Sequence, residues 1–149
     1  MIDSSLLWQY SLFDGLEKEQ IEYVLTLMEQ NVFEAGKDII VEGGNNDKIH
    51  FILEGHVAVS KDGVNLMELI EGNVFGEMEV LEVLPVEATI TAVIDTKVMT
   101  LSIDALGEIY DTDLQTYSFI LMNLARDISR RLRNLNIRVV KDSPPTDWC

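Results

Sequence analysis

The run from Phe75 to Ala92 holds the residues of this chain that are best suited to binding a small anion. Gly76 lets the main chain approach a ligand closely. The short helix expected to begin near Glu77 would direct free backbone N–H groups, and the positive end of its dipole, at a phosphate. An Ala88-Thr89 pair then leads into a strand, so the pattern predicts a backbone cradle for an anion.

The charge of the same run opposes that prediction, because it carries four acidic residues and no basic one. No lysine or arginine occurs between Lys61 and Lys97, so the local sequence supplies no cation that could pair with a bound anion. The C-terminal segment is the only other source, and from it Arg126 and Arg130 are candidate lid contacts over the pocket. Geometry therefore favours an anion at this site, and charge disfavours it.

The elements expected to position the run change from helix to strand and back to helix. Apolar residues recur at helical spacing from Glu17 to Glu29, after which the period becomes two residues. Short strands are expected at residues 32–33, 38–41, 49–53, 57–59, 66–70, 89–94 and 97–103. The glycines between them occur at intervals typical of a small barrel or roll, which predicts an antiparallel β-roll with N-terminal helices.

A long helix is expected from about residue 113 to 139, with one continuous apolar seam. Its candidate dimer-contact residues are Leu114, Tyr117, Leu121, Leu124, Ile128, Leu132 and Leu135, with Ala125 and Val139 beside them. At about 1.5 Å per residue the helix would be about 40 Å long, more than one face of a small domain covers. We therefore predict a homodimer through this helix, with a helix folded wholly back on its own domain as the alternative. The expected organisation is a roll at 1–112, the helix at 113–140 and a tail at 141–149.

The composition favours one soluble domain, with 149 residues of which 47% are hydrophobic. Residues 1–110 hold 21 acids and 5 bases, whereas residues 111–149 hold 5 acids and 6 bases. A body of that charge repels nucleic acid and acidic membranes, so we expect neither as a partner. No apolar stretch approaches the roughly 18 residues of a membrane span, and we expect a cytoplasmic location.

Catalytic and metal-binding patterns are weak. No serine stands in a nucleophile-elbow context, no P-loop is present, and the single cysteine, Cys149, is terminal. The carboxylates of the acidic run are spaced so that a bending segment scatters them, which favours a solvated face over a metal site. His50 and His56 are interpreted as surface residues. We therefore expect a protein that is not an enzyme and that holds no metal.

Several spaced motifs together resemble the cyclic nucleotide-binding domain over about residues 11–135. They are Val32 to Ile40 leading to Glu42-Gly43, then Ile52 to Val57, Phe75-Gly76-Glu77, Pro85 and Ala88-Thr89. The resemblance implies an eight-stranded β-roll, a phosphate-binding cassette at residues 75–92, and a long C-terminal helix that serves as lid, dimer interface or both. The sensor domains of catabolite activator and fumarate–nitrate regulators are built this way. Those proteins continue into a helix-turn-helix domain, which we do not expect after Cys149.

The resemblance also assigns ligand-binding roles. Gly76 would give close backbone approach, Glu77 would accept a hydrogen bond from the ribose 2′-hydroxyl, and Thr89 would meet phosphate or base. Met78, Val86 and Ala88 complete the candidate ligand-binding set. Val86 stands where ligand-binding members carry the arginine that pairs with the cyclic phosphate. Loss of such an arginine removes about 1.5–3 kcal/mol, roughly ten- to a hundredfold in affinity.

Two functional hypotheses follow. The first is a stand-alone regulatory sensor that couples occupancy of the roll by a small ligand, cyclic AMP or cyclic GMP among the candidates, to the C-terminal helix. The second is a degenerate domain that binds no nucleotide and serves dimerisation or protein interaction, Gly76 and Glu77 being kept for turn geometry and helix capping. Val86 is the residue that separates them.

Overall fold

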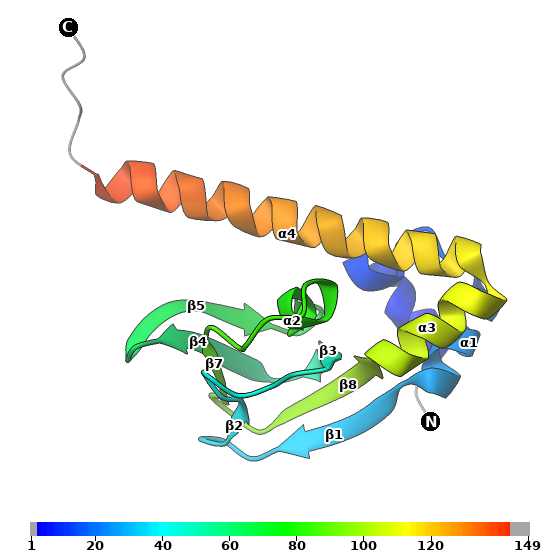
Figure 1. Cartoon of the computed structure of the whole chain (residues 1–149), viewed down its shortest axis with the longest axis horizontal. Coiled ribbons are helices and arrows are strands. Elements are labelled where there is room, and N and C mark those ends of the chain that lie inside the picture. The colour runs from blue at the N-terminus through cyan, green and yellow to red at the C-terminus, as the bar shows by residue number, and fades with distance from the viewer. Residues whose placement is uncertain (1–2, 144–149) are drawn as a thin grey trace, which may run out of the picture.

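The computed structural model describes residues 3–143 and confirms the predicted antiparallel β-roll. One four-stranded sheet has the order β1 (Glu29–Phe33), β8 (Thr96–Ser102), β3 (Lys48–Glu54) and β6 (Val74–Phe75). The other has the order β2 (Asp38–Ile40), β7 (Thr89–Ala92), β4 (His56–Lys61) and β5 (Val64–Ile70). Strands distant in sequence are therefore neighbours, and the two sheets together form the roll (Figure 1).

Two apolar clusters hold the fold because side chains alternate across the central strands β3 and β8. Phe51 and Leu101 point from the first sheet to the helices, whereas Ile52 and Val98 point between the sheets. The cluster between the sheets consists of Ile40, Ile52, Val57, Leu69, Phe75, Val86, Ile90 and Val98. Strands β2 to β8 contribute buried residues to it, and Phe33 of β1 packs against its edge, so the interior of the roll is filled by residues from most of the chain.

The N-terminal segment forms two 3₁₀ helices, η1 (Ser4–Gln9) and η2 (Ser11–Phe13), followed by α1 (Lys18–Leu27). A reciprocal capping box between Glu17 and Gln20 starts α1. The helix predicted to reach Glu29 ends earlier, because Glu29 pairs with Thr100 as the first residue of β1. Strand pairing therefore determines where this helix stops.

A helix that was not predicted from the sequence, α3 (Ile103–Thr112), follows β8. The Ser102 side chain caps it by accepting a hydrogen bond from the backbone N–H of Ala105 at 3.1 Å. Only Ala105, Leu106 and Ile109 are buried, and Gly107 lies in its middle. So short an apolar face gives a weak helical period, and burial against α4 and β8 supplies the missing preference.

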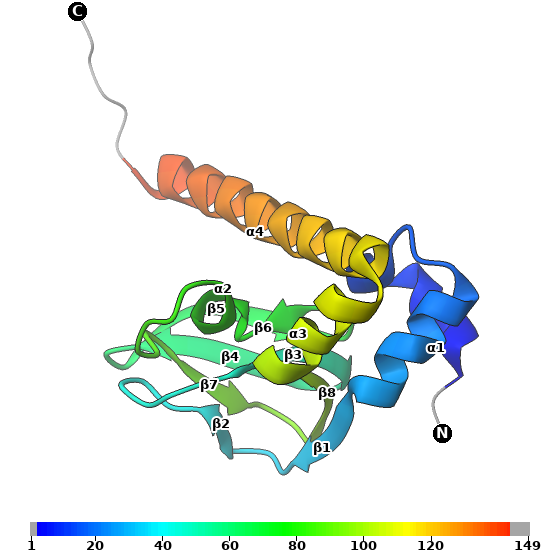
Figure 2. The ribbon, with the colours of Figure 1, turned by 45° about the vertical axis from the view of Figure 1, so that its right-hand side comes forward.

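The long helix α4 (Leu114–Asp142) is present and runs two residues beyond the expected boundary at 140. The predicted stop at Pro144 and Pro145 lies outside the described residues. Asn123 anchors the first half of α4 by donating hydrogen bonds of 2.9 Å to the backbone carbonyls of Leu12 and Asp14. From residue 132 to 143 every side chain is exposed. Figures 1 and 2 show α4 passing above the short helix α2 (Glu77–Leu81) and continuing above β5.

Candidate functional site

The turn that enters α2 requires a glycine. Gly76 has a left-handed φ of 80°, and a Cβ atom built on it would lie 2.7 Å from Nδ2 of Asn46 and 2.8 Å from the carbonyl oxygen of Lys48. Nδ2 of Asn46 donates to the carbonyl oxygens of Gly76 and Lys48 at 2.8 and 2.9 Å. The residues before β3 therefore fix the path of the chain into the cassette at residues 75–92.

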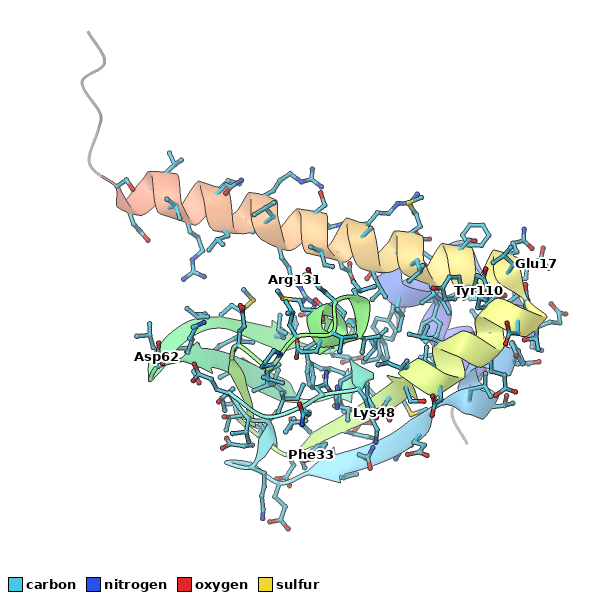
Figure 3. The ribbon with its side chains drawn as sticks, in the orientation of Figure 1. Glu17, Phe33, Lys48, Asp62, Tyr110 and Arg131 are labelled. Carbon is cyan, nitrogen blue, oxygen red and sulfur yellow. The ribbon has the colours of Figure 1, made fainter. Side chains whose placement is uncertain are left out.

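Glu77 is buried, with only 4% of its surface exposed, and its carboxylate is paired. Nη1 of Arg131 on α4 donates to Oε1 of Glu77 at 2.8 Å, and the same guanidinium donates to the carbonyl oxygen of Val74. Burial raises the pKa of Glu77, and the charge of Arg131 acts in the opposite direction. Figure 3 shows Arg131 between α4 and the roll.

Val86 lies inside the roll instead of facing a ligand. Its side chain is 4% exposed and packs with Phe75, Ile52 and the other residues of the cluster between the sheets. Its backbone N–H donates to the carbonyl oxygen of Gly44 at 3.1 Å, and its own carbonyl accepts from the N–H of Gly43 at 2.8 Å. Side chain and main chain of Val86 are therefore both engaged within the domain.

The other candidate ligand contacts are spread over the cassette. Thr89 begins β7, and its Oγ1 accepts a hydrogen bond of 3.0 Å from the backbone N–H of Glu42. Ala88 beside it is partly buried, whereas Met78 on α2 is largely exposed. Burial raises the pKa of Glu79, with a further contribution from the neighbouring charges of Glu77 and Glu87. The site thus gathers carboxylates, and Arg131 is the cation that pairs with Glu77.

His50 is a buried residue, so its interpretation as a surface residue was wrong. Its ring is 6% exposed and stacks on Phe75 with centroids 4.7 Å apart. Burial lowers the pKa of His50 to about 4, and its Nδ1 has no hydrogen-bond partner among residues 3–143. His56 is different, because its Nε2 lies 2.9 Å from Oε2 of Glu68 near the surface. His50 was misassigned because the residue that covers its ring, Phe75, is distant in the sequence.

The two arginines expected as lid contacts pair elsewhere. Arg126 lies 3.9 Å from Asp14, and Arg130 lies 2.8 Å from Asp127 on its own helix. Arg131 contacts the cassette in their place. Helical spacing gives a signal for it, because Ile120, Leu124 and Arg131 are four and then seven residues apart and share the buried face of α4.

The candidate dimer residues divide into two groups along α4. Leu124 is buried in its own domain, and Tyr117, Leu121 and Ile128 are partly covered. Tyr117 packs edge-on against Tyr110 of α3 with centroids 5.1 Å apart. Three members of the predicted seam stay exposed: Leu114, Leu132 and Leu135. The first half of α4 thus packs on its own domain through Leu124 and its neighbours, although Leu114 is exposed, and the apolar residues from Leu132 onward lie in solvent.

The model of the cyclic nucleotide-binding domain family matches residues 30–113, which is more than half of the chain. The chain belongs to this family. The resemblance that the spaced motifs carried is thus confirmed, together with the roll and the long helix that it implied. The family model ends where α4 begins, so α4 is described by the structure and by the longer comparisons.

Two relatives and one solved structure illustrate the membership. The chain is 40% identical over 75 residues to the cAMP-dependent protein kinase regulatory subunit of Eremothecium gossypii, covering 50% of this chain and 16% of that protein. It is 26% identical over 133 residues to the Cyclic AMP receptor protein of Thermus thermophilus, covering 86% of this chain and 60% of that protein. A cyclic nucleotide-binding domain from Methylobacillus flagellatus has the same fold, with a TM-score of 0.86 at 22% identity over 97% of this chain and 84% of that one.

The chain therefore spans less than two thirds of these two curated relatives, and the parts of those proteins outside the shared domain have no counterpart in the alignments. Within the shared domain this member keeps Gly76 and Glu77 at the start of the cassette. It buries Val86 at the position where the family resemblance places a phosphate-binding arginine. None of the helices within residues 3–143 is long and apolar enough to cross a bilayer.

Proposed function

We propose that this chain is a non-catalytic regulatory module that couples occupancy of the β-roll to the position of α4 through the pair Glu77 and Arg131. The observation that carries the proposal is the hydrogen bond of 2.8 Å between Nη1 of Arg131 and Oε1 of Glu77. It is a direct contact between the cassette and the long helix, 54 residues apart in the sequence.

Competition for Glu77 supplies the coupling. A ligand hydroxyl that donates to the Glu77 carboxylate takes the position now held by a guanidinium N–H. Arg131 then loses a buried partner, and removing one partner of a buried ion pair costs about 3–5 kcal/mol. In the ligand-bound protein, a position of α4 that gives Arg131 new contacts becomes favoured. Ligand affinity and helix position are therefore linked.

The apolar, buried Val86 supplies no cation at the position where the family resemblance expects the phosphate-binding arginine. We propose that cyclic AMP and cyclic GMP bind this chain at millimolar concentration or not at all. The second candidate function, a degenerate domain for dimerisation or protein interaction, is favoured by one observation. Both backbone groups of Val86 are paired with Gly43 and Gly44, and its side chain fills the roll.

We also propose that the second half of α4 forms a homodimer interface. Leu135 continues the seven-residue repeat of Leu121 and Ile128, and Leu132 and Val139 flank it on the same side of the helix. Leu132, Leu135 and Val139 are exposed in the single chain, at 57%, 45% and 56% of their surface. A second copy of the same helix would bury them on both sides. Such an interface adjoins Arg131, so a shift of α4 would reach the partner subunit.

The test is a titration of cyclic AMP and cyclic GMP into three proteins by isothermal calorimetry: wild type, Arg131→Gln, and Val86→Arg combined with Glu87→Ala. The coupling proposal expects the third protein to bind, and expects the ligand to change amide hydrogen exchange in residues 126–142. Arg133→Gln is the matched control, because Arg133 has no contact with the cassette. Binding without any change of exchange in α4 contradicts the coupling. No heat from any of the proteins, with circular dichroism showing that the variant carrying Val86→Arg is folded, favours the degenerate domain.

A further inference from the structure

The outer face of α4 carries an arginine-lined groove of about 400 Å³ around one serine. Its lining residues are Ala125, Arg126, Ser129, Arg130 and Arg133. Ala125, Ser129 and Arg133 are four residues apart, so they form one row along the helix, and all three are exposed. Figure 3 shows nitrogen-tipped side chains projecting from the side of α4 that faces away from the roll.

The positive charge around Ser129 is only partly compensated. Arg130 has a close carboxylate, Asp127 at 2.8 Å, but the pair of Arg126 with Asp14 is 3.9 Å long and more than half exposed, where such pairs contribute little. Arg133 has no carboxylate within 4.0 Å anywhere in residues 3–143. Like charges spaced three and four residues apart on a helix repel. An anion at the centre of the groove would relieve this repulsion.

The hydroxyl of Ser129 differs from those of the other serines on α4. The hydroxyl of Ser118 donates to the carbonyl oxygen of Leu114 at 2.8 Å, and that of Ser143 donates to Val139 at 2.6 Å. Ser129 makes no side-chain hydrogen bond to another residue among those described. It therefore offers an exposed, uncommitted hydroxyl in the middle of three guanidinium groups.

We propose that Ser129 is a phosphorylation site whose phosphate is held by Arg126 and Arg133. The reaction forms a bond between Oγ of Ser129 and the γ-phosphorus of a nucleoside triphosphate, breaks the bond to the nucleoside diphosphate, and passes the hydroxyl proton to the base of a protein kinase. The kinase class is one that selects basic residues beside the acceptor, since arginines stand three residues before and four residues after Ser129. The phosphate adds about −1.5 to −2 charges at pH 7 and three acceptor oxygens.

The surrounding structure allows a kinase to reach the serine. Beyond residue 128, the polar contacts that tie described residues of α4 to the roll come from Arg131 and Arg138, the latter donating to the carbonyl oxygen of Leu66 at 3.1 Å. Since residues 132–143 are exposed on all sides, unwinding of α4 from this end back to Ser129 breaks the contacts of Arg131 and Arg138 and little other side-chain packing. Ser129 is also about 100° around the helix axis from Ile128, so it flanks the proposed dimer seam and stays outside it.

Phosphorylation would act on the ion pairs near the contact of α4 with the N-terminal segment, because Arg126 also pairs with Asp14. A dianion at Ser129 draws Arg130 away from Asp127, which also accepts hydrogen bonds from the hydroxyl of Ser11 at 3.0 and 3.1 Å. The modification therefore alters the contacts between α4 and η2 without requiring a ligand in the cassette. The phosphorylation proposal rests on the arginine groove alone, so it does not depend on whether a nucleotide binds to the roll.

Two measurements test the site. In the first, phosphoserine is encoded genetically at position 129 or, as the matched control, at Ser118, which has no basic residue within four positions. Phosphorus NMR titration is expected to give a second phosphate pKa at 129 that is lower than at 118 by roughly half a unit or more. Arg133→Gln is expected to remove much of that difference. Equal phosphate pKa values at the two positions overturn the proposal.

In the second measurement, the unmodified chain is incubated with ATP and the catalytic subunit of a cAMP-dependent protein kinase, and the intact mass is recorded. One phosphate is expected on the wild type and none on Ser129→Ala, with transfer at least tenfold slower for Arg126→Gln. Absence of phosphate at Ser129 overturns the proposal. A parallel titration with inorganic phosphate identifies a site for free anions. If free phosphate binds the arginines while Ser129 remains unmodified, the modification proposal is wrong.

Discussion

The guanidinium of Arg131 lies 2.8 Å from the carboxylate of Glu77 and also donates to the carbonyl oxygen of Val74. One side chain of α4 thus satisfies a buried carboxylate of the cassette and a backbone carbonyl of β6. In this family member, the residue that the resemblance assigns to the ribose is already bound by the chain itself. This contact between α4 and Glu77 is the one on which the proposed coupling rests.

Replacing Arg131 by glutamine should destabilise the protein by about 3 kcal/mol, because Glu77 is left buried without its partner. Urea denaturation at pH 7 measures the loss. Arg133→Gln is the control, with an expected change within about 0.5 kcal/mol because that side chain is exposed. The loss should shrink as the pH falls, since protonation of Glu77 removes the unpaired charge. Equal stability of the two variants at pH 7 would show that the pair contributes little.

His50 should make stability depend on pH between about 6.5 and 4. Burial lowers the pKa of His50 to about 4 in the folded protein, against about 6.5 in an unfolded chain. Within this window the unfolded state binds more protons, so stability is highest above pH 6.5 and falls as the pH decreases. The contribution lost by pH 4 is about 3 kcal/mol at 1.36 kcal/mol per pKa unit.

The His50→Leu variant isolates this effect from other titrating groups. Glu77 acts in the opposite sense, because burial raises its pKa and its contribution is lost as the pH rises through the folded value. The two titrations overlap, so the measurement is the difference between wild type and His50→Leu in urea titrations from pH 7 to pH 4. A difference that stays constant over this range would mean that His50 is not buried in its neutral form.

Gly76 should tolerate alanine much less well than Gly36, although both have a left-handed φ, of 80° and 89°. At Gly36 a Cβ atom meets nothing within 4 Å, and the expected cost is about 1 kcal/mol from the backbone alone. At Gly76 the Cβ atom would collide with Asn46 and the carbonyl of Lys48, so the expected cost is about 3 kcal/mol or more. Thermal unfolding of the two alanine variants compares them directly. Similar melting temperatures would indicate that the entrance to α2 is loosely packed.

Aspartate at Leu132 and Leu135 together should convert the proposed homodimer into a monomer, since the charges would lie in the apolar seam. Light scattering measures the mass. Ile137→Asp is the matched control, because Ile137 is exposed on the same turns of α4 but lies off the seven-residue repeat. A wild type that is already monomeric, or a dimer mass unchanged in the double variant, would contradict the proposal.

Much of the fold was predictable from the sequence because its strands alternate at a period of two and are separated by glycines. The turn at Asp62-Gly63, with φ values of 51° and 77°, and the helix at 114–142 depend on strong local signals. The motif at Gly76-Glu77 could also be recognised in the sequence, since a local backbone conformation requires the glycine. These features depend on neighbours in the chain, which a sequence contains.

Tertiary structure decided which side chains meet across the fold. Five arginines lie within 13 residues of α4, and the packing of the helix on the rest of the domain brings Arg131, which shares the buried face with Ile120 and Leu124, to Glu77. His50 is buried because Phe75, 25 residues later, stacks on it, and Val86 is buried because strands from both sheets close around it. Local sequence determines the period and turns of each element, whereas long-range packing determines the partner, the burial and therefore the charge state of each functional side chain.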